Sequence, residues 1–369
     1  MRAVYKFLIF VCFILNVNYS YAFEIGINAH VSRYEDTPEN ILALVKTGGF
    51  TSIRAGIPWD ALEKNKGNME FGKNYIKLDK LLLSSDSSIV NNSLLFLGYG
   101  NKNYTGGSYP QSKEQIAAFA NYTRWIANRY KGKVKYYEIW NEWLVGTGLP
   151  KKTTVPDAAV FIELVKESSK AIRQEDPNAI ILTGSINPLS QRDVSWMFSL
   201  IDMGVLNYVD GLSIHPYSYK SKKINERNVL TNIKLMDQFE NKLAQRSGKS
   251  VDLYITEMGF PTSKYVQGGV SETQAGLSVL RYTIAARSRP YIKGIWWYDL
   301  IDDGTNKLNN EHNFGFIQFD GTPKYSFNLL SEYSKRINDK KLFLNENDGI
   351  IQESESGGNQ FKPLSLKKE

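Results

Sequence analysis

Residues 136–143 form the stretch Tyr-Tyr-Glu-Ile-Trp-Asn-Glu-Trp (YYEIWNEW), a strand-like run that ends in two adjacent polar residues. Tyr, Ile and Trp are typical of a half-buried pleated surface, so the first part predicts a strand. Strict alternation would place Asn141 and Glu142 on opposite faces of that strand. Both can reach one pocket only if the strand bulges or ends there. Glu138 lies deeper in the same strand, and we expect it to be structural and bonded to a basic or hydroxyl side chain.

Seven similar runs occur elsewhere in the chain, and most are followed by a helical pattern. The eight predicted strands are Glu24–Asn28, Ser52–Gly56, Leu94–Gly98, Val134–Trp140, Ala179–Thr183, Val209–Ile214, Asp252–Thr256 and Ile292–Trp297. Alternating strands and helices imply parallel pairing, because parallel strands need long crossovers. Eight repeats predict an α/β fold, a (β/α)8 TIM barrel, with a single catalytic domain over residues 23–344. A doubly wound open sheet competes, but the glycine-rich phosphate loop that often marks it does not follow an early strand.

Helix signals lie in the intervals between these strands. Capping boxes, in which a serine and the third residue after it satisfy each other's backbone donors, are predicted at Ser112 with Gln115 and at Ser271 with Gln274. Helical periodicity runs from Asp157 to Gln174. These signals support the alternation on which the barrel prediction depends.

The first 22 residues predict a secretory signal peptide. They carry Arg2 and Lys6, then an apolar run from Phe7 to Leu15 that is too short to span a bilayer comfortably, and cleavage is expected after about Ala22. An uncleaved anchor is the alternative. Cleavage would give a secreted or periplasmic protein with no stable membrane anchor.

Composition excludes several classes of function. Cys12, in the predicted signal peptide, is the only cysteine of the 369 residues, so the mature chain would have no disulfide, thiol catalysis or cysteine-bound zinc. Loss of Arg2 and Lys6 lowers the formal charge from +7 to +5 without leaving a dense basic run, which does not support nucleic-acid binding. The mild positive charge would suit an acidic polymer as substrate. Residues 345–369 are polar and predict a flexible tail, although Ile350-Ile351 could dock on the body.

Polar and aromatic residues follow the predicted strands, where barrel enzymes place their chemistry. They are His30, Arg54, Tyr99, Asn101, Asn141, Glu142, His215, Tyr217, Glu257, Trp297 and Asp299. Glu142 ends the fourth strand and Glu257 ends the seventh. A glycosidic bond is cleaved by one carboxylic acid that protonates the leaving oxygen and a second carboxylate that attacks the anomeric carbon or activates water. The pair therefore predicts glycoside hydrolysis; the alternative is that each glutamate forms a structural ion pair at the barrel rim.

The sequence also resembles a known group of enzymes. Ile-Trp-Asn-Glu at 139–142, Ile-Thr-Glu-Met-Gly at 255–259 and His-Pro-Tyr at 215–217, with Arg54 and the Trp-Trp-Tyr run at 296–298, are similar to clan A of the retaining glycoside hydrolases. Glu-His-Asn-Phe-Gly at 311–315 and Asp-Gly-Thr-Pro-Lys at 320–324 resemble family 39, including endoglycosidases associated with bacterial exopolysaccharide synthesis. Family 5 endoglycanases are the second resemblance.

The resemblance implies a role for each matching residue. Glu142 would be the general acid/base, and Asn141 would hydrogen-bond the sugar 2-hydroxyl. Glu257 would be the nucleophile that forms the glycosyl-enzyme. Arg54 and Tyr217 would bond to that nucleophile and keep it ionised, and its charge would raise the pKa of Glu142.

The remaining candidates are substrate-binding residues. His215 would help to order the site, or would be a satisfied core histidine. Trp297 would form the floor of the subsite for the reacting sugar. Trp296 is the alternative, because two consecutive tryptophans do not show which of them faces the pocket. The other candidates, each with a structural alternative, are His30, Tyr99 and Trp143.

Neither a metal nor a cofactor is expected. The only histidines, at 30, 215 and 312, include no ligand pair at helical spacing. The expected function is endo-acting hydrolysis of a polysaccharide by a monomeric protein, with a bacterial exopolysaccharide as the candidate substrate. An exo-acting glycosidase on oligosaccharides and a non-catalytic carbohydrate-binding barrel are the alternatives.

Overall fold

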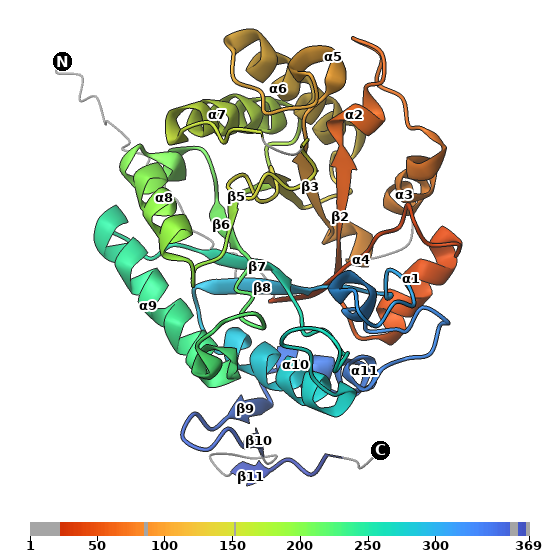
Figure 1. Ribbon diagram of the computed structural model, residues 1–369, viewed down its shortest axis with the longest axis vertical. Coiled ribbons are helices and arrows are strands. Elements are labelled where there is room, and N and C mark those ends of the chain that lie inside the picture. The colour runs from red at the N-terminus through yellow and green to blue at the C-terminus, as the bar shows by residue number, and fades with distance from the viewer. Residues whose placement is uncertain (1–22, 85–87, 151–152, 355–360, 367–369) are drawn as a thin grey trace, which may run out of the picture.

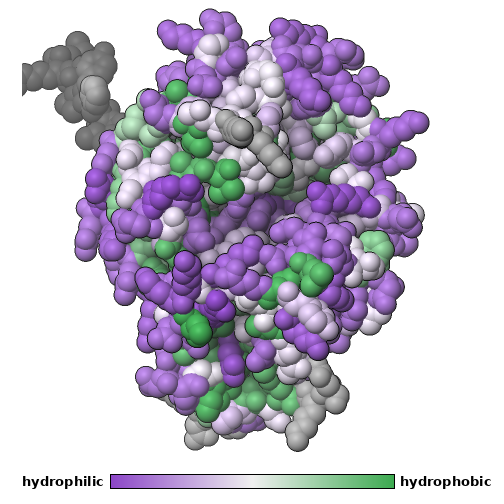
Figure 2. All heavy atoms as spheres, viewed as in Figure 1, coloured by the Kyte–Doolittle hydropathy of each residue, from purple (hydrophilic) through white to green (hydrophobic). Residues whose placement is uncertain are grey.

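The computed structural model describes residues 23–84, 88–150, 153–354 and 361–366. The predicted signal peptide lies outside these residues. Within the described ranges, no helix is both long enough and apolar enough to cross a membrane. Hydrophilic side chains cover most of the face shown in Figure 2.

Eight parallel strands close into a barrel in sequence order, which confirms the predicted fold. Pairing of the first strand with the eighth completes the ring. The strands are β1 (Glu24–Asn28), β2 (Ser52–Pro58), β3 (Leu94–Gly98), β4 (Tyr136–Ile139), β5 (Ile180–Ile186), β6 (Gly211–Ile214), β7 (Leu253–Met258) and β8 (Ile292–Trp297). All eight predicted strands exist, with bounds that shift by a few residues.

Helices surround the barrel (Figure 1). The α-helices are α1 (Pro38–Thr47), α2 (Trp59–Leu62), α3 (Lys73–Leu83), α4 (Ser88–Asn91), α5 (Lys102–Thr105), α6 (Lys113–Arg129), α7 (Ala158–Glu175), α8 (Gln191–Asp202), α9 (Val229–Ser247), α10 (Glu272–Arg287) and α11 (Tyr325–Asn338). Three short 3-10 helices are η1 (Val205–Asn207), η2 (Ile224–Arg227) and η3 (Asn310–Asn313).

The predicted helix starts are confirmed. Capping boxes open α6 at Ser112 and α10 at Ser271, with both reciprocal bonds present in each. Asp157 caps α7 by accepting a hydrogen bond from the backbone N–H of Val160. The sequence signals therefore position the helices that cover the outer face of the barrel.

The lower barrel interior is filled by an aromatic and aliphatic layer that includes Trp296, Tyr136 and Tyr254. Trp296 is wholly buried, and its indole N–H donates to Ser52 Oγ at 2.8 Å. Gly26 on β1 makes room for it, because a Cβ there would lie 2.2 Å from Trp296 Cδ1. This packed layer leaves the C-terminal ends of the strands as the place for a pocket.

The C-terminal segment has more structure than the sequence predicts. β9 (Leu342–Leu344), β10 (Ile351–Ser354) and β11 (Phe361–Pro363) form an antiparallel sheet beyond α10, at the bottom of Figure 1. Ile351 is buried, whereas Ile350 is exposed. The prediction of a flexible tail is wrong for β10 and β11, because backbone pairing orders a segment with little apolar content. The docking that the sequence allows for Ile350-Ile351 is made by Ile351. The predicted boundary at residue 344 falls within the sheet.

Candidate active site

The strand ends enclose a pocket of about 880 Å³. Each of the eight barrel strands, or the segment that follows it, contributes at least one residue to its walls. Among them are the predicted site residues His30, Arg54, Tyr99, Asn141, Glu142, Tyr217 and Glu257. Residues far apart in the sequence therefore share one cavity, as the barrel prediction requires.

The chain leaves β4 through a sharp backbone change. The strand ends at Ile139, and the next residue, Trp140, has a φ of 65°, as Glu142 does at 53°. Non-glycine residues seldom adopt this left-handed conformation. The change breaks the alternation of the strand, so Asn141 and Glu142 both line the pocket. The sequence requires the strand either to bulge or to end before Asn141 and Glu142, and β4 ends at Ile139.

Arg54 on β2 is the centre of the buried hydrogen-bond network. Its Nε donates to Glu138 Oε2 at 2.8 Å, and its Nη1 donates to Asn28 Oδ1 at 2.8 Å and Glu257 Oε1 at 2.6 Å. Its Nη2 donates to Asn141 Oδ1 at 2.7 Å. The guanidinium is only 1% exposed. Because a guanidinium is planar and rigid, it fixes its partners relative to one another.

Glu138 is structural, as the sequence predicts. Besides Arg54, its carboxylate accepts hydrogen bonds from Ser185 Oγ at 2.5 Å and Thr256 Oγ1 at 3.1 Å. Burial raises the pKa of Glu138, but the charge of Arg54 and the other partners outweigh burial and hold the pKa below its ordinary value. Glu138 therefore supplies the counter-charge that stabilises Arg54 in the barrel interior.

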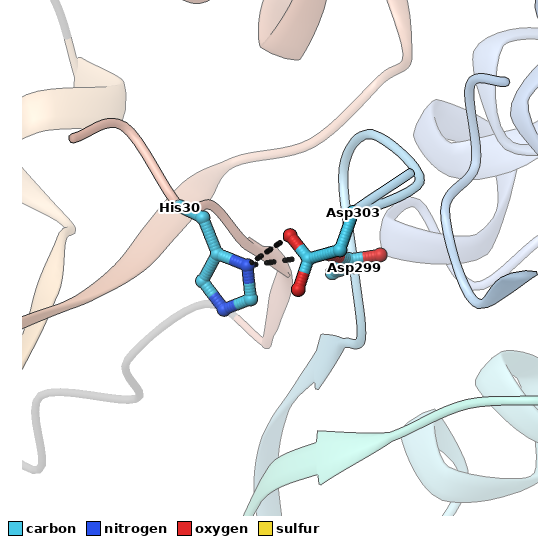
Figure 3. Close-up of side chains that lie close together, drawn as sticks. All are labelled: His30, Asp299 and Asp303. Atoms are coloured by element: carbon cyan, nitrogen blue, oxygen red, sulfur yellow. Dashed lines mark hydrogen bonds and ion pairs between the residues drawn. The ribbon is translucent and has the colours of Figure 1, made fainter. Parts of the chain in front are cut away.

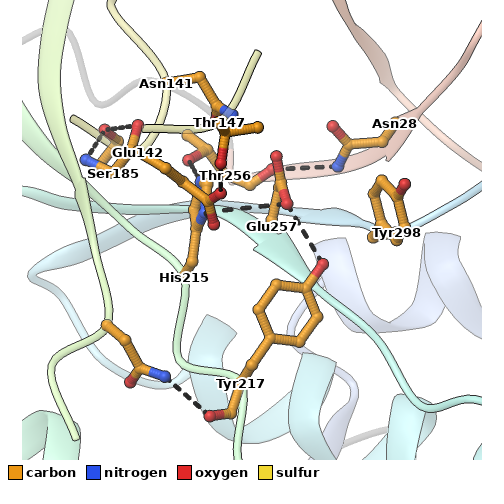
Figure 4. Close-up of polar contacts among 12 residues, drawn as sticks. Asn28, Asn141, Glu142, Thr147, Ser185, His215, Tyr217, Thr256, Glu257 and Tyr298 are labelled. Carbon is orange, nitrogen blue, oxygen red and sulfur yellow. Dashed lines mark hydrogen bonds and ion pairs between the residues drawn. The ribbon is translucent and has the colours of Figure 1, made fainter. Parts of the chain in front are cut away.

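His215, which follows β6, lies between the two candidate catalytic glutamates (Figure 4). Its Nδ1 is 3.1 Å from Glu142 Oε1 and 3.7 Å from Glu257 Oε2, and its Nε2 is 3.1 Å from Thr256 Oγ1. Each glutamate has an oxygen within 4.8 Å of one belonging to the other. Burial lowers the pKa of His215, but the two carboxylates outweigh burial and raise it.

The protonation of Glu142 differs from the expectation. Burial raises its pKa, but hydrogen bonds to His215 and Thr147 and the charge of His215 outweigh burial and lower it. Thr147 Oγ1 donates to Glu142 Oε2 at 2.5 Å. The expected raised pKa of Glu142 is therefore wrong, because the sequence does not show that His215 lies next to Glu142.

Two tyrosines that line the pocket form hydrogen bonds with Glu257 and Asn141. Tyr217 donates its hydroxyl to Glu257 Oε2 at 3.3 Å, and Asn141 Nδ2 donates to Tyr99 OH at 3.1 Å. Figure 4 shows the Tyr217 ring pointing its hydroxyl at Glu257. Asn141 is thus held at both ends of its amide, by Arg54 and by Tyr99.

The predicted tryptophans are not pocket residues, and this prediction is wrong. Trp297 is fully buried on the outer side of β8, where its indole N–H donates to Thr283 Oγ1 of α10 at 3.2 Å. Trp296 lies in the lower barrel layer described above. Trp143 is also buried, and its indole N–H donates to the Pro156 carbonyl at 3.3 Å. β8 ends at Trp297, so the next residue, rather than the Trp pair, reaches the pocket.

Sequence reasoning missed several pocket residues. Tyr298 takes the place expected of Trp297, and its position directly after the doubled Trp was the available signal. Asn28 is the last residue of β1 and was not singled out. Thr147 lies in a loop without a recognisable pattern. The other aromatic residues in the walls are Tyr75, Phe96, Tyr219 and Phe314. Asn101 is fully buried and caps α5, so it is structural.

Within the part of the chain that the structure describes, two groups of side chains have ligand atoms close enough together to share a cation. One is Glu142, His215 and Glu257, and the other is His30 with Asp299 and Asp303. The second group lies at the edge of the same pocket, which His30 and Asp303 line.

A closed parallel barrel with glutamates at the ends of β4 and β7 defines a clan A glycoside hydrolase. The chain belongs to glycosyl hydrolase family 5, since the family model described as "Cellulase (glycosyl hydrolase family 5)" matches residues 19–298. It is therefore a glycoside hydrolase. The clan resemblance of the sequence is confirmed, and the family model matches the second of the two families named. No protein of curated function matches the chain in sequence.

Solved structures show the same fold at low sequence identity. A family 39 glycoside hydrolase from the gut symbiont Bacteroides cellulosilyticus WH2 is 20% identical with a TM-score of 0.71, over 92% of this chain and 69% of that chain. Xylanase 10B from Thermotoga maritima is 15% identical with a TM-score of 0.58, over 87% and 96%. An exo-beta-1,4-mannosidase from Opitutaceae bacterium strain TAV5 is 16% identical with a TM-score of 0.60, over 86% and 60%.

Proposed function

We propose that this protein is a retaining, endo-acting glycoside hydrolase that cleaves a polysaccharide by double displacement, with Glu257 as nucleophile and Glu142 as general acid/base. The observation that carries the proposal is the separation of the two glutamates, whose nearest oxygens lie within 4.8 Å. Carboxylates about 5–5.5 Å apart are typical of retaining enzymes, whereas inverting enzymes leave about 6.5–9.5 Å for a water molecule.

The surroundings of Glu257 suit a nucleophile. Arg54 and Tyr217 each hold one of its oxygens, at 2.6 and 3.3 Å. These bonds orient the carboxylate and stabilise its negative charge. Glu257 would attack the anomeric carbon as Glu142 protonates the leaving oxygen. Glu142 would then remove a proton from the water that hydrolyses the glycosyl-enzyme.

His215 offers a place to keep the proton that Glu142 needs. The raised pKa of His215 and the lowered pKa of Glu142 favour a proton on the imidazole over a proton on the carboxylate. Its Nδ1 is 3.1 Å from Glu142 Oε1, which is within reach for proton transfer. A bound sugar would exclude water from Glu142 and strengthen the burial that favours its neutral form.

The pocket supports a polymeric substrate. Its volume of about 880 Å³ is near the upper end of the roughly 300–1,000 Å³ that is usual for ligand sites. Aromatic side chains such as Tyr75, Tyr219 and Tyr298 line it, and aromatic residues are common in the walls of ligand sites. An exopolysaccharide of the producing bacterium is our proposed substrate, and the mild positive charge of the chain favours an anionic one.

Location and assembly are part of the proposal. The apolar run and basic residues of the first 22 residues support export, followed by cleavage after about Ala22 and activity in the periplasm or medium as a monomer. N-terminal sequencing of the protein recovered from those fractions, with size-exclusion chromatography, tests this. A protein that retains residues 1–22 would overturn it.

The central experiment is incubation with a panel of polysaccharides, including the producer's own exopolysaccharide. Mass analysis of early products distinguishes endo from exo action, because an endo enzyme releases a range of oligosaccharides first. NMR of the freshly formed anomeric centre should show retained configuration. Inverted products would exclude the mechanism, and single-sugar release from chain ends would exclude endo action. Binding of a polysaccharide without any product would favour a non-catalytic carbohydrate-binding protein.

A further inference from the structure

A second polar cluster lies at the edge of the pocket, outside the catalytic network. His30 follows β1, and Asp299 and Asp303 follow β8 (Figure 3). His30 Nδ1 lies 2.8 Å from Asp303 Oδ1 and 3.6 Å from Asp299 Oδ2. One donor atom from each residue lies within 4.8 Å of the other two. None of the three has a role in the proposed hydrolysis.

Asp299 is the unusual member of this cluster. Its side chain is completely buried, and neither of its carboxylate oxygens accepts a hydrogen bond from the described residues. Neither neighbouring cation pairs with Asp299. Lys324 pairs with Asp302 at 2.7 Å, and Arg33 Nη1 pairs with Asp303 at 2.7 Å and lies 3.4 Å from His30 Nδ1. A buried carboxylate that accepts no hydrogen bond is costly, so it normally binds a proton or a cation.

We propose that His30, Asp299 and Asp303 bind a divalent transition-metal cation of the Zn²⁺ or Mn²⁺ type. Imidazole nitrogen is a ligand that zinc favours, and carboxylate oxygen suits both zinc and manganese. Zinc lies about 2.0–2.2 Å from such ligands, so atoms that share one ion are at most about 4.4 Å apart. His30 Nδ1 lies within this limit of both carboxylates, at 2.8 and 3.6 Å, and the two carboxylate oxygens lie within 4.8 Å of each other, so small side-chain adjustments would let all three share one ion.

The cluster has an open side toward the pocket. His30 and Asp303 line the cavity, whereas Asp299 closes the cluster from the protein interior. Three protein ligands leave coordination positions for water or for sugar hydroxyls that pass along this wall. Arg33, which now bonds the far oxygen of Asp303, has a side chain 64% exposed and can keep that bond or turn to solvent.

The site was not expected from the sequence, because no histidine pair occurs at helical spacing. The ligands come instead from the ends of two strands that are adjacent only because the barrel closes between β1 and β8. The other cluster with metal-like spacing, around His215, differs in that hydrogen bonds within the protein satisfy its carboxylates. The carboxylate of Asp299, which has no such bonds, therefore favours the cluster around His30.

Isothermal titration calorimetry of the chelator-treated full chain with ZnCl₂ and MnCl₂ tests the proposal. We expect saturable binding of about one cation per chain. Mutation of a residue that only hydrogen-bonds to a metal ligand typically reduces metal affinity about 10–100-fold. Loss of a ligand itself, in Asp299→Asn, should therefore reduce the affinity at least about 100-fold. His30→Ala, at a partly exposed position, provides a second variant should Asp299→Asn fold poorly.

Two control variants distinguish a cation bound at this cluster from one bound elsewhere in the pocket. Glu311→Gln removes one negative charge from the pocket wall without removing a ligand, and Glu257→Gln disables the other cluster; both should keep the cation. No saturable binding by the wild-type chain, or loss of binding in Glu257→Gln but not in Asp299→Asn and His30→Ala, would overturn the proposal. Because binding is measured directly, its failure is distinct from failure of the proposed hydrolysis.

Discussion

Arg54 Nη1 donates a 2.6 Å hydrogen bond to Glu257 Oε1, which joins the guanidinium on β2 to the glutamate at the end of β7 across the barrel mouth. The same guanidinium holds Glu138, Asn28 and Asn141. One buried side chain therefore holds the proposed nucleophile and the amide expected to bind the sugar in fixed positions relative to each other. We therefore expect the proposed activity to be sensitive to substitution of Arg54.

Arg54→Lys should reduce kcat/KM strongly. Lysine is a point charge and cannot reproduce the four directed bonds. Loss of one charge-assisted hydrogen bond costs about 1.5–3 kcal/mol, which predicts a decrease of roughly 10–150-fold. Arg129→Lys is the matched control, because Arg129 also makes a two-pronged contact, with Asp79, but neither residue lines the pocket. Equal effects of the two changes on kcat/KM would contradict the role of Arg54.

Glu142→Ala should distinguish substrates by their leaving groups. A substrate with a good leaving group needs no proton and should retain much of its rate, whereas one with a poor leaving group should lose the general-acid contribution of about 10²–10⁴-fold. Glu257→Ala should abolish turnover of both. Initial rates on paired aryl glycosides measure the difference. Similar losses on both substrates in Glu142→Ala would argue against the acid role.

Thr147→Val should move the basic limb of the pH profile. The Thr147 hydroxyl helps to hold the pKa of Glu142 down, so its removal should raise that pKa. The protonated acid then persists to higher pH, and the fall in kcat/KM moves upward by as much as about one pH unit, since a hydrogen bond contributes about 0.5–1.5 kcal/mol. Thr153→Val serves as the control, because among the described residues the Thr153 hydroxyl donates to the Pro150 carbonyl and not to Glu142. A downward movement would refute the assignment.

Asp299→Asn should stabilise the metal-free protein at neutral pH. Burial and the neighbouring carboxylates Asp303 and Asp302 raise the pKa of Asp299 well above its ordinary value. Its contribution to stability is therefore full below the unfolded pKa of 3.8 and is lost as the pH rises through the folded pKa. Removal of the charge should increase the free energy of unfolding at pH 7 by about 1–3 kcal/mol.

Chemical denaturation at pH 7 and pH 3.5, with EDTA present, measures this effect. The advantage of Asp299→Asn should be small at the lower pH. The exposed Asp339 supplies the control substitution Asp339→Asn, which should change little at either pH. A destabilised Asp299→Asn protein at pH 7 would mean that the carboxylate has a compensating partner.

Tyr298 and Trp297 should separate substrate binding from stability. Tyr298→Ala should raise KM by roughly fivefold or more, since truncation of an important contact residue costs about 1 kcal/mol or above. Trp297→Phe should leave KM unchanged while lowering the melting temperature, because Trp297 is buried and bonded to Thr283 of α10. A rise in KM in Trp297→Phe but not in Tyr298→Ala would show that Trp297, rather than Tyr298, contributes to substrate binding.

Much of the fold could be predicted because its signals are local. The strand runs follow from side-chain type, and the starts of α6 and α10 follow from serines that cap their own helices. Strand ends in a parallel barrel meet on one face, so Glu142 and Glu257 could be paired without coordinates. The tail could not be predicted in the same way, since its order depends on long-range pairing of β9 with β10.

Residue type and strand order alone are enough to predict the barrel, the two glutamates and the polar residues around them. Which neighbours these residues have depends on the folded chain. His215 lies beside Glu142 and reverses the expected direction of the Glu142 pKa shift, Trp297 faces outward to bond Thr283 of α10, and Asp299 lies next to His30 because β1 closes on β8. Facing, burial and cross-barrel distance depend on how the ring closes, and no local pattern in the chain encodes them.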